Sequence, residues 1–132
     1  LPKGVSKPDN VYFLGDLPRE DMGSVYSTAD IFLLPSICEG SAMASYEAGA
    51  FALPIVTTLQ SGTIYSHNES ALICDCFDLN ALISNVDALL RSSELRNYLG
   101  LNAQSAVSKR GPIEYGKEII EAIESGGKNG CF

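Results

Sequence analysis

Four short apolar runs alternate with segments of helical character, and this alternation limits the fold more than any other feature of the chain. The runs are short enough for buried strands and cover residues 10–15, 30–35, 53–58 and 70–75. The other segments have the spacing or the small-residue composition of helices and cover residues 17–29, 42–50, 78–91, 92–110 and 113–125. This order predicts a single α/β domain over residues 1–132, with a Rossmann-like parallel sheet flanked by helices.

Several predicted helix ends carry local signals. Asp78 is expected to be an N-cap, and either Ser92 or Ser93 is expected to cap the helix that follows. That helix should stop at residues 109–112, Lys-Arg-Gly-Pro, because glycine and proline end helices. Residues 126–132 are expected to form a disordered tail.

The charge balance and the cysteine content exclude several classes of function. The formal charge is −7 and the pI about 4.5, so neither nucleic acid nor an anionic membrane is an expected partner. No run approaches the ~18 apolar residues of a membrane span, and we expect a cytoplasmic protein. Four cysteines and a single histidine, His67, give little support to a metal site. The cysteines are expected to be small, buried, reduced thiols, and His67 an exposed loop residue.

Residues 35–50, PSICEGSAMASYEAGA, place Glu39 and Glu47 just after a predicted strand. Ligands of parallel α/β sheets bind beyond the carboxyl ends of the strands, so a site is expected here. Gly40 allows a tight turn or a close backbone approach, and the first N–H groups of the following helix attract a phosphate. Carboxylates accept hydrogen bonds from sugar hydroxyls, so the pair suits a molecule with two sugar ends and a diphosphate between them.

The order of these features resembles one family. Pro35-Ser36 at a strand end, the Glu39-x7-Glu47 spacing and the strand LPIVTT are similar to the C-terminal domain of the retaining glycosyltransferases of group 1 (family 4), which have the GT-B fold. The resemblance extends through the paired helices that begin at residue 78 and covers about residues 9–108. Two glutamates at this spacing are a weak signal alone, but their ordered context makes the match specific. The chain resembles an incomplete nucleotide-sugar-binding domain, part of the C-terminal half of a GT-B fold.

The resemblance implies roles for the residues of the motif. Glu39 would be the catalytic residue, contacting hydroxyls of the transferred sugar, and Glu47 would bind the ribose of a nucleotide-diphosphate sugar. Transfer to an acceptor would retain the anomeric configuration without a metal or other cofactor, as in polysaccharide biosynthesis. The further donor-binding candidates are Gly40, Ser41, Ala42, Met43, Ser36, Thr58 and Gly62.

Simpler interpretations stay open for several of these residues. Ser36 and Thr58 end predicted strands, where hydroxyls are often local caps. Gly62 fits either a phosphate-facing loop or an ordinary turn. Glu39 in a loop and Glu47 on a helix also fit solvated surface carboxylates.

The sequence also departs from the family pattern. Gly40-Ser41-Ala42 replaces the usual Gly-Phe-Gly, so the chain is expected to differ from its relatives here. The family clamps the diphosphate with an Arg and a Lys from earlier strands. None of the nine Lys and Arg residues of this chain lies between residues 36 and 69.

The resemblance begins near the third strand of the family's domain. We therefore expect no turnover by this chain alone, with an acceptor glycan or lipid-linked sugar bound by a missing N-terminal domain or partner chain, which could lie at a membrane. Without its neighbours, the strand at residues 10–15 is expected to be detached, repositioned or paired with another molecule, as in a strand-swapped oligomer. The alternative function is a non-catalytic partner or regulatory domain of a complete transferase.

Overall fold

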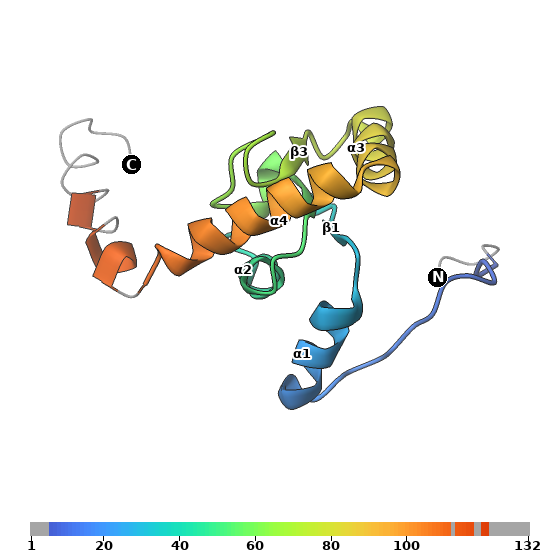
Figure 1. The fold of residues 1–132 in the computed structure, drawn as a ribbon, viewed down its shortest axis with the longest axis horizontal. Helices are drawn as coiled ribbons and strands as arrows, with labels where there is room; N and C mark the ends of the chain where they lie inside the picture. Colours follow the sequence, from blue (N-terminus) through green and yellow to red (C-terminus); the bar gives the residue numbers. More distant parts are fainter. Residues whose placement is uncertain (1–5, 112, 118–119, 122–132) are drawn as a thin grey trace.

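A computed structural model describes residues 6–111, 113–117 and 120–121 of the chain. Within these residues a parallel sheet has the strand order β1-β2-β3, and helices pack around it (Figure 1). The strands are β1 (Phe32–Leu34), β2 (Ile55–Thr58) and β3 (Leu72–Cys74). The helical elements are α1 (Arg19–Thr28), α2 (Met43–Ala50), the short 3-10 turn η1 (Leu59–Ser61), α3 (Leu79–Arg91) and α4 (Ser93–Ser108). The predicted fold class is confirmed, as are these strands and α-helices. Residues 113–117 and 120–121 are also helical, as predicted.

The sheet carries a hydrophobic core on both faces, because β2 is its central strand and is buried throughout. Ile55 and Val56 follow each other on β2, so their side chains point to opposite faces. On one face Ile55 clusters with Ala103 of α4. On the other face Val56 clusters with Leu89 of α3 and Leu99 of α4. Helix α4 therefore contributes buried side chains to both faces of the sheet.

The predicted N-caps of the last two named helices are present. The Asp78 carboxylate accepts a hydrogen bond from the backbone N–H of Ala81 at 2.9 Å and caps α3. The Ser92 hydroxyl accepts one from the N–H of Leu95 at 3.1 Å, so Ser92, not Ser93, caps α4. Each contact satisfies a backbone donor that has no partner inside its helix.

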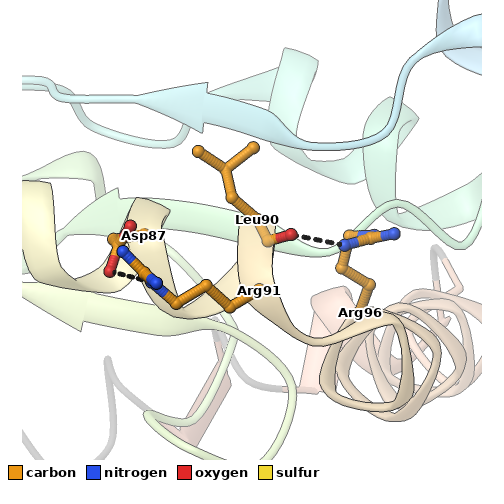
Figure 2. Close-up of polar contacts among 4 residues, drawn as sticks. All are labelled: Asp87, Leu90, Arg91 and Arg96. Carbon is orange, nitrogen blue, oxygen red and sulfur yellow. Dashed lines mark hydrogen bonds and ion pairs between the residues drawn. The ribbon is translucent and has the colours of Figure 1, made fainter.

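Arg96 of α4 connects this helix to the end of α3. Its Nη1 donates to the carbonyl oxygen of Leu89 at 2.6 Å and to that of Leu90 at 3.4 Å, the second of which is drawn in Figure 2. These carbonyls belong to the last turn of α3, where backbone acceptors lack helical partners. Figure 2 also shows the ion pair between Arg91 and Asp87, 2.6 Å long and exposed on both sides, which contributes little to stability.

The predicted buried strand at residues 10–15 is wrong. Residues 6–18, the described part of the chain before α1, run apart from the sheet (Figure 1) and make no strand pairing. Its apolar side chains are exposed, from 37% for Val11 to 77% for Tyr12. A strand forms only where a neighbouring strand takes its backbone hydrogen bonds, and β1 pairs with β2 alone in the described sheet. The segment is detached, which was one of the outcomes expected for it.

Several smaller expectations have mixed outcomes. Cys38, Cys74 and Cys76 are free thiols, but only Cys74 is buried, and Cys38 is exposed. His67 lies in an exposed loop as predicted, where its Nδ1 accepts from the Ile73 N–H. Among the residues described, no helix combines the length and apolar character needed to cross a membrane. The fourth cysteine and the predicted tail at residues 126–132 lie outside the described part of the chain.

Candidate functional site

The loops that follow β1 and β2 meet at the carboxyl edge of the sheet, where the site is predicted. The N–H of Glu39 donates to the carbonyl of Gln60 at 2.9 Å. The Thr58 side chain is 1% exposed, and its hydroxyl donates to the carbonyl of Ser36. Thr58 thus holds the two strand ends together, as a local cap, and a direct donor contact by Thr58 stays a prediction.

Gly62 is a second point of close approach between the two loops. It follows η1 in the left-handed conformation, with φ +62°. A Cβ at this position would lie 2.2 Å from the carbonyl oxygen of Gly40 and 3.2 Å from that of Glu39. Gly62 is therefore required both by its backbone conformation and by the close approach of the motif loop. The structure gives it a packing role that the sequence did not reveal.

Gln60 extends the same assembly to the end of β3. Its Nε2 donates to the carboxylate of Asp75 at 3.0 Å, and its Oε1 accepts from the N–H of Cys76 at 3.1 Å. Together with the bond from Glu39 to its carbonyl, Gln60 links the loops after all three strands. The Asp75 carboxylate also accepts from the N–H of Phe77. This bond, followed by that from Gln60, lowers the pKa of Asp75 below its usual value.

This linkage predicts a pH effect at Asp75. A carboxyl whose pKa is lower in the folded state stabilises the fold above its unfolded pKa, and the contribution disappears as the pH falls through the folded pKa. Asp75→Asn should therefore be less stable than the parent chain near pH 6, and the difference should shrink toward pH 3. Urea unfolding of both proteins across this range measures it. A difference that stays constant with pH would show that ionisation of Asp75 does not contribute.

Helix α2 begins directly after the motif loop and has no side-chain N-cap, because Ala42 stands at that position. The N–H of Ser45 donates to the carbonyl of Ala42 at 2.9 Å, and no side chain caps the first turn, so a phosphate site at the N–H groups before Ser45 stays a prediction. Tyr65 helps to fix this helix in place, because its buried hydroxyl donates to the carbonyl of Ser45 at 2.8 Å. Ala42 is itself buried, whereas the Met43 side chain is exposed.

The two glutamates have different surroundings. Glu39 is exposed, and its Oε1 accepts from the Ser36 hydroxyl at 3.1 Å. Glu47 is half-buried, and its Oε2 accepts from the Tyr26 hydroxyl of α1 at 3.0 Å. Burial, the bond to Glu47 and the charge of Glu47 raise the pKa of Tyr26 to about 12, so the phenol stays a donor at neutral pH. Glu47 is thus oriented by Tyr26, a partner that the helical pattern of residues 17–29 did not single out.

A cleft of about 590 Å³ lies against the motif loop. Three of the nine candidate residues line this cleft: Gly40, Ser41 and Gly62. The other six candidates, including both glutamates, are not among its lining residues. The opposite part of the lining comes from the end of α4 and the segment after it: Ala106, Lys109, Arg110 and Tyr115.

Sequence reasoning missed Lys109 and Arg110 as site residues. Their position before Gly111-Pro112 indicated only the end of a helix, and the region from residue 36 to residue 69 contains no cation. The structure brings both cations to the cleft because α4 packs along α2 and β2 and ends beside the motif loop. Among the described residues no three His, Cys, Asp or Glu side chains gather to hold a metal ion. Metal-free transfer stays a prediction of the family resemblance.

The sequence of this chain is similar to those of known glycosyltransferases. The family model for "Glycosyl transferases group 1" matches residues 3–106. An uncharacterized glycosyltransferase of Haemophilus influenzae is 31% identical over 91% of this chain and 33% of its own length. The capsular polysaccharide biosynthesis glycosyltransferase CapM of Staphylococcus aureus is 29% identical over 77% of this chain and 27% of its own. The matched part of the chain therefore spans between about a quarter and a third of the length of these relatives.

A solved structure shows the same fold. Sucrose-phosphate synthase from Thermosynechococcus elongatus superposes with a TM-score of 0.74 at 22% identity, over 89% of this chain and 31% of its own. Together with the family match, this likeness supports a C-terminal domain of the GT-B fold for the three parallel strands and their helices. With the family model covering most of the sequence, the chain belongs to the group 1 glycosyl transferases.

Proposed function

We propose that this chain is the donor-binding portion of a retaining glycosyltransferase and binds a nucleotide-diphosphate sugar. The observation that carries the proposal is the path of the motif loop. It runs from Glu39 through Gly40 into the uncapped N-terminus of α2, with Glu47 within that helix and the cleft beside the loop. An anion at a helix N-terminus is stabilised by free N–H groups and by the helix dipole.

The residues have separate roles in this proposal. Glu47, held by Tyr26, accepts hydrogen bonds from the ribose hydroxyls, and Glu39 contacts the transferred sugar near its reacting carbon. The backbone from Gly40 to Met43 meets the diphosphate and the sugar. Transfer keeps the anomeric configuration and needs no metal. The acceptor, a glycan or a lipid-linked sugar, binds to a part of the enzyme outside this chain.

Calorimetric titration of the 132-residue chain with UDP, GDP and ADP tests the proposal. One of the three should bind, and Glu47→Ala should weaken its binding by at least about tenfold, because two hydrogen bonds to a charged acceptor are lost. Glu47→Gln keeps the shape of the side chain and its contact with Tyr26, so it should weaken binding while leaving the thermal midpoint near that of the parent.

Two controls separate binding from folding. Tyr26→Phe removes the phenol that orients Glu47 but keeps the carboxylate, so its loss of affinity should be smaller than that of Glu47→Ala. Glu20→Ala removes an exposed carboxylate from α1 and should bind like the parent chain. Failure of all three nucleotides to bind, or equal affinity for the parent and Glu47→Ala, would contradict the proposal.

A further inference from the structure

The cleft has a charge opposite to that of the chain. The sequence carries a formal charge of −7, yet among the described residues that line the cleft the charged ones are Lys109 and Arg110. The remaining polar side chains of this lining are hydroxyls, from Ser41, Thr63 and two tyrosines. A concave surface with two cations, several hydroxyls and no described carboxylate in its lining favours a small anion over a neutral sugar.

Arg110 is held in place by aromatic contacts. Its Nη1 donates to the hydroxyl of Tyr46 at 2.8 Å. Its guanidinium carbon lies 5.8 Å from the centre of the Tyr46 ring and 5.7 Å from that of the Tyr115 ring. Both distances are in the range of cation–π interactions, which fix the orientation of an arginine. The positive charge of Arg110 is therefore positioned at the cleft wall before any ligand arrives.

Tyr46 connects Arg110 to the motif loop. It lies in α2, and its hydroxyl is also 3.1 Å from the Ser41 hydroxyl, which donates to it. Hydrogen bonds thus run from the end of α4 to the loop that precedes α2. These contacts connect a fixed cation to the loop that leads into the N-terminus of α2, and the cation and the helix N-terminus both favour negative charge.

Lys109 supplies the second cation. It is exposed, lines the cleft, and also lines a smaller neighbouring pocket of about 170 Å³ together with Glu69. Two other described carboxylates are near the cleft: Glu39 precedes Gly40 in the chain, and Glu114 accepts from the N–H of Gly111 at 3.1 Å. These acids lie outside the lining of the larger cleft, so the charge that its described lining presents is positive.

We propose that Lys109 and Arg110 hold the diphosphate of the donor, a role that rests on the function proposed above. A lysine is a compact point charge and an arginine is a planar fork, and both bind phosphate oxygens through charge-assisted hydrogen bonds. The two cations come from the end of α4, a different element from the strands that carry the family's basic pair. The diphosphate then lies in the cleft, against Gly40 and Ser41 of the motif loop.

Titration with inorganic pyrophosphate tests the diphosphate site directly. Pyrophosphate should bind the parent chain, and Lys109→Gln and Arg110→Gln should each weaken the binding about five- to tenfold. Lys109 is exposed, so its variant should fold normally even if Arg110→Gln proves less stable; circular dichroism checks both. Arg19→Gln removes one cation from the start of α1, outside the cleft, and should keep the affinity of the parent.

The outcomes separate this inference from the function on which it rests. Absence of pyrophosphate binding, equal affinity of Lys109→Gln and the parent, or an equal loss in Arg19→Gln would overturn the inference. If a nucleotide diphosphate binds through Glu47 but is insensitive to Lys109→Gln and Arg110→Gln, the inference falls and the proposed function stands. If pyrophosphate binding depends on both cations but no nucleotide binds, the anion site stands and the proposed function falls.

Discussion

Replacing Gly100 by alanine should destabilise the chain by about 2–3 kcal/mol, although alanine is the better residue inside a helix. Gly100 lies in α4, and a Cβ at this position would be 2.0 Å from the carbonyl oxygen of Ala52 and 2.9 Å from its carbonyl carbon. These are backbone atoms of the turn after α2, so they cannot rotate away as a side chain could. The helix must shift, and with it the packing of α4 on both core clusters.

Urea unfolding followed by circular dichroism measures this loss as a lower midpoint with an unchanged slope. Gly116→Ala is the matched control. It is the same change within a helical segment, but its Cβ would meet no atom within 4 Å. We expect this control to be neutral or to gain up to about 1 kcal/mol. Similar stabilities for the two variants would show that α4 does not lie against the turn at Ala52 in solution.

Replacing Gly62 by alanine should be about as costly, and it should also impair ligand binding. The left-handed conformation costs a non-glycine residue about 1–2 kcal/mol. The new Cβ would also overlap the backbone, because it would lie 2.2 Å from the Gly40 carbonyl oxygen. We therefore expect the free energy of unfolding to fall by about 2–3 kcal/mol in total. Relief of this overlap pushes Gly40 away from η1, and the loop that leads into α2 then moves with it.

Gly40→Ala is the control for this contact, because it changes the other glycine of the pair without causing overlap. A Cβ on Gly40 would meet nothing within 4 Å, so its stability should stay within about 0.5 kcal/mol of the parent. Thermal unfolding of the two variants, and calorimetry with the nucleotide that binds the parent, provide the comparison. Normal stability of Gly62→Ala would mean that the loops after β1 and β2 are not in contact.

The elements that the sequence predicted correctly are those with local signals. Helix α3 has an apolar stripe and Asp78 as its cap, and α4 has Ser92 at its start, so both could be located from neighbouring residues alone. The predicted strand at residues 10–15 has an equally apolar pattern, yet it lacks a strand to pair with in the described fold. An apolar composition indicates that a segment can form a strand, but whether it does depends on a neighbouring strand that takes its backbone hydrogen bonds.

In the site, too, the features with local signals were predicted and those that depend on distant residues were not. The motif glutamates and the glycine loop were found from spacing along the chain. The contacts that orient them come from distant residues: Tyr26 reaches Glu47 from α1, and Arg110 reaches Tyr46 from the far end of α4. Such contacts depend on helix length and packing direction, which no short motif contains. Gln60 was missed for this reason as well, because its partners lie in two other loops: Glu39 after β1, and Asp75 and Cys76 after β3.

The position of α4 has a consequence for how the chain folds during synthesis. Two of the core clusters contain buried residues of this helix, Leu99 on one face of the sheet and Ala103 on the other. A nascent chain that ends before α4 can pair its strands but leaves apolar surface uncovered on both sides. Until the last named helix has been synthesised, both faces of the sheet therefore keep exposed apolar surface, which favours aggregation.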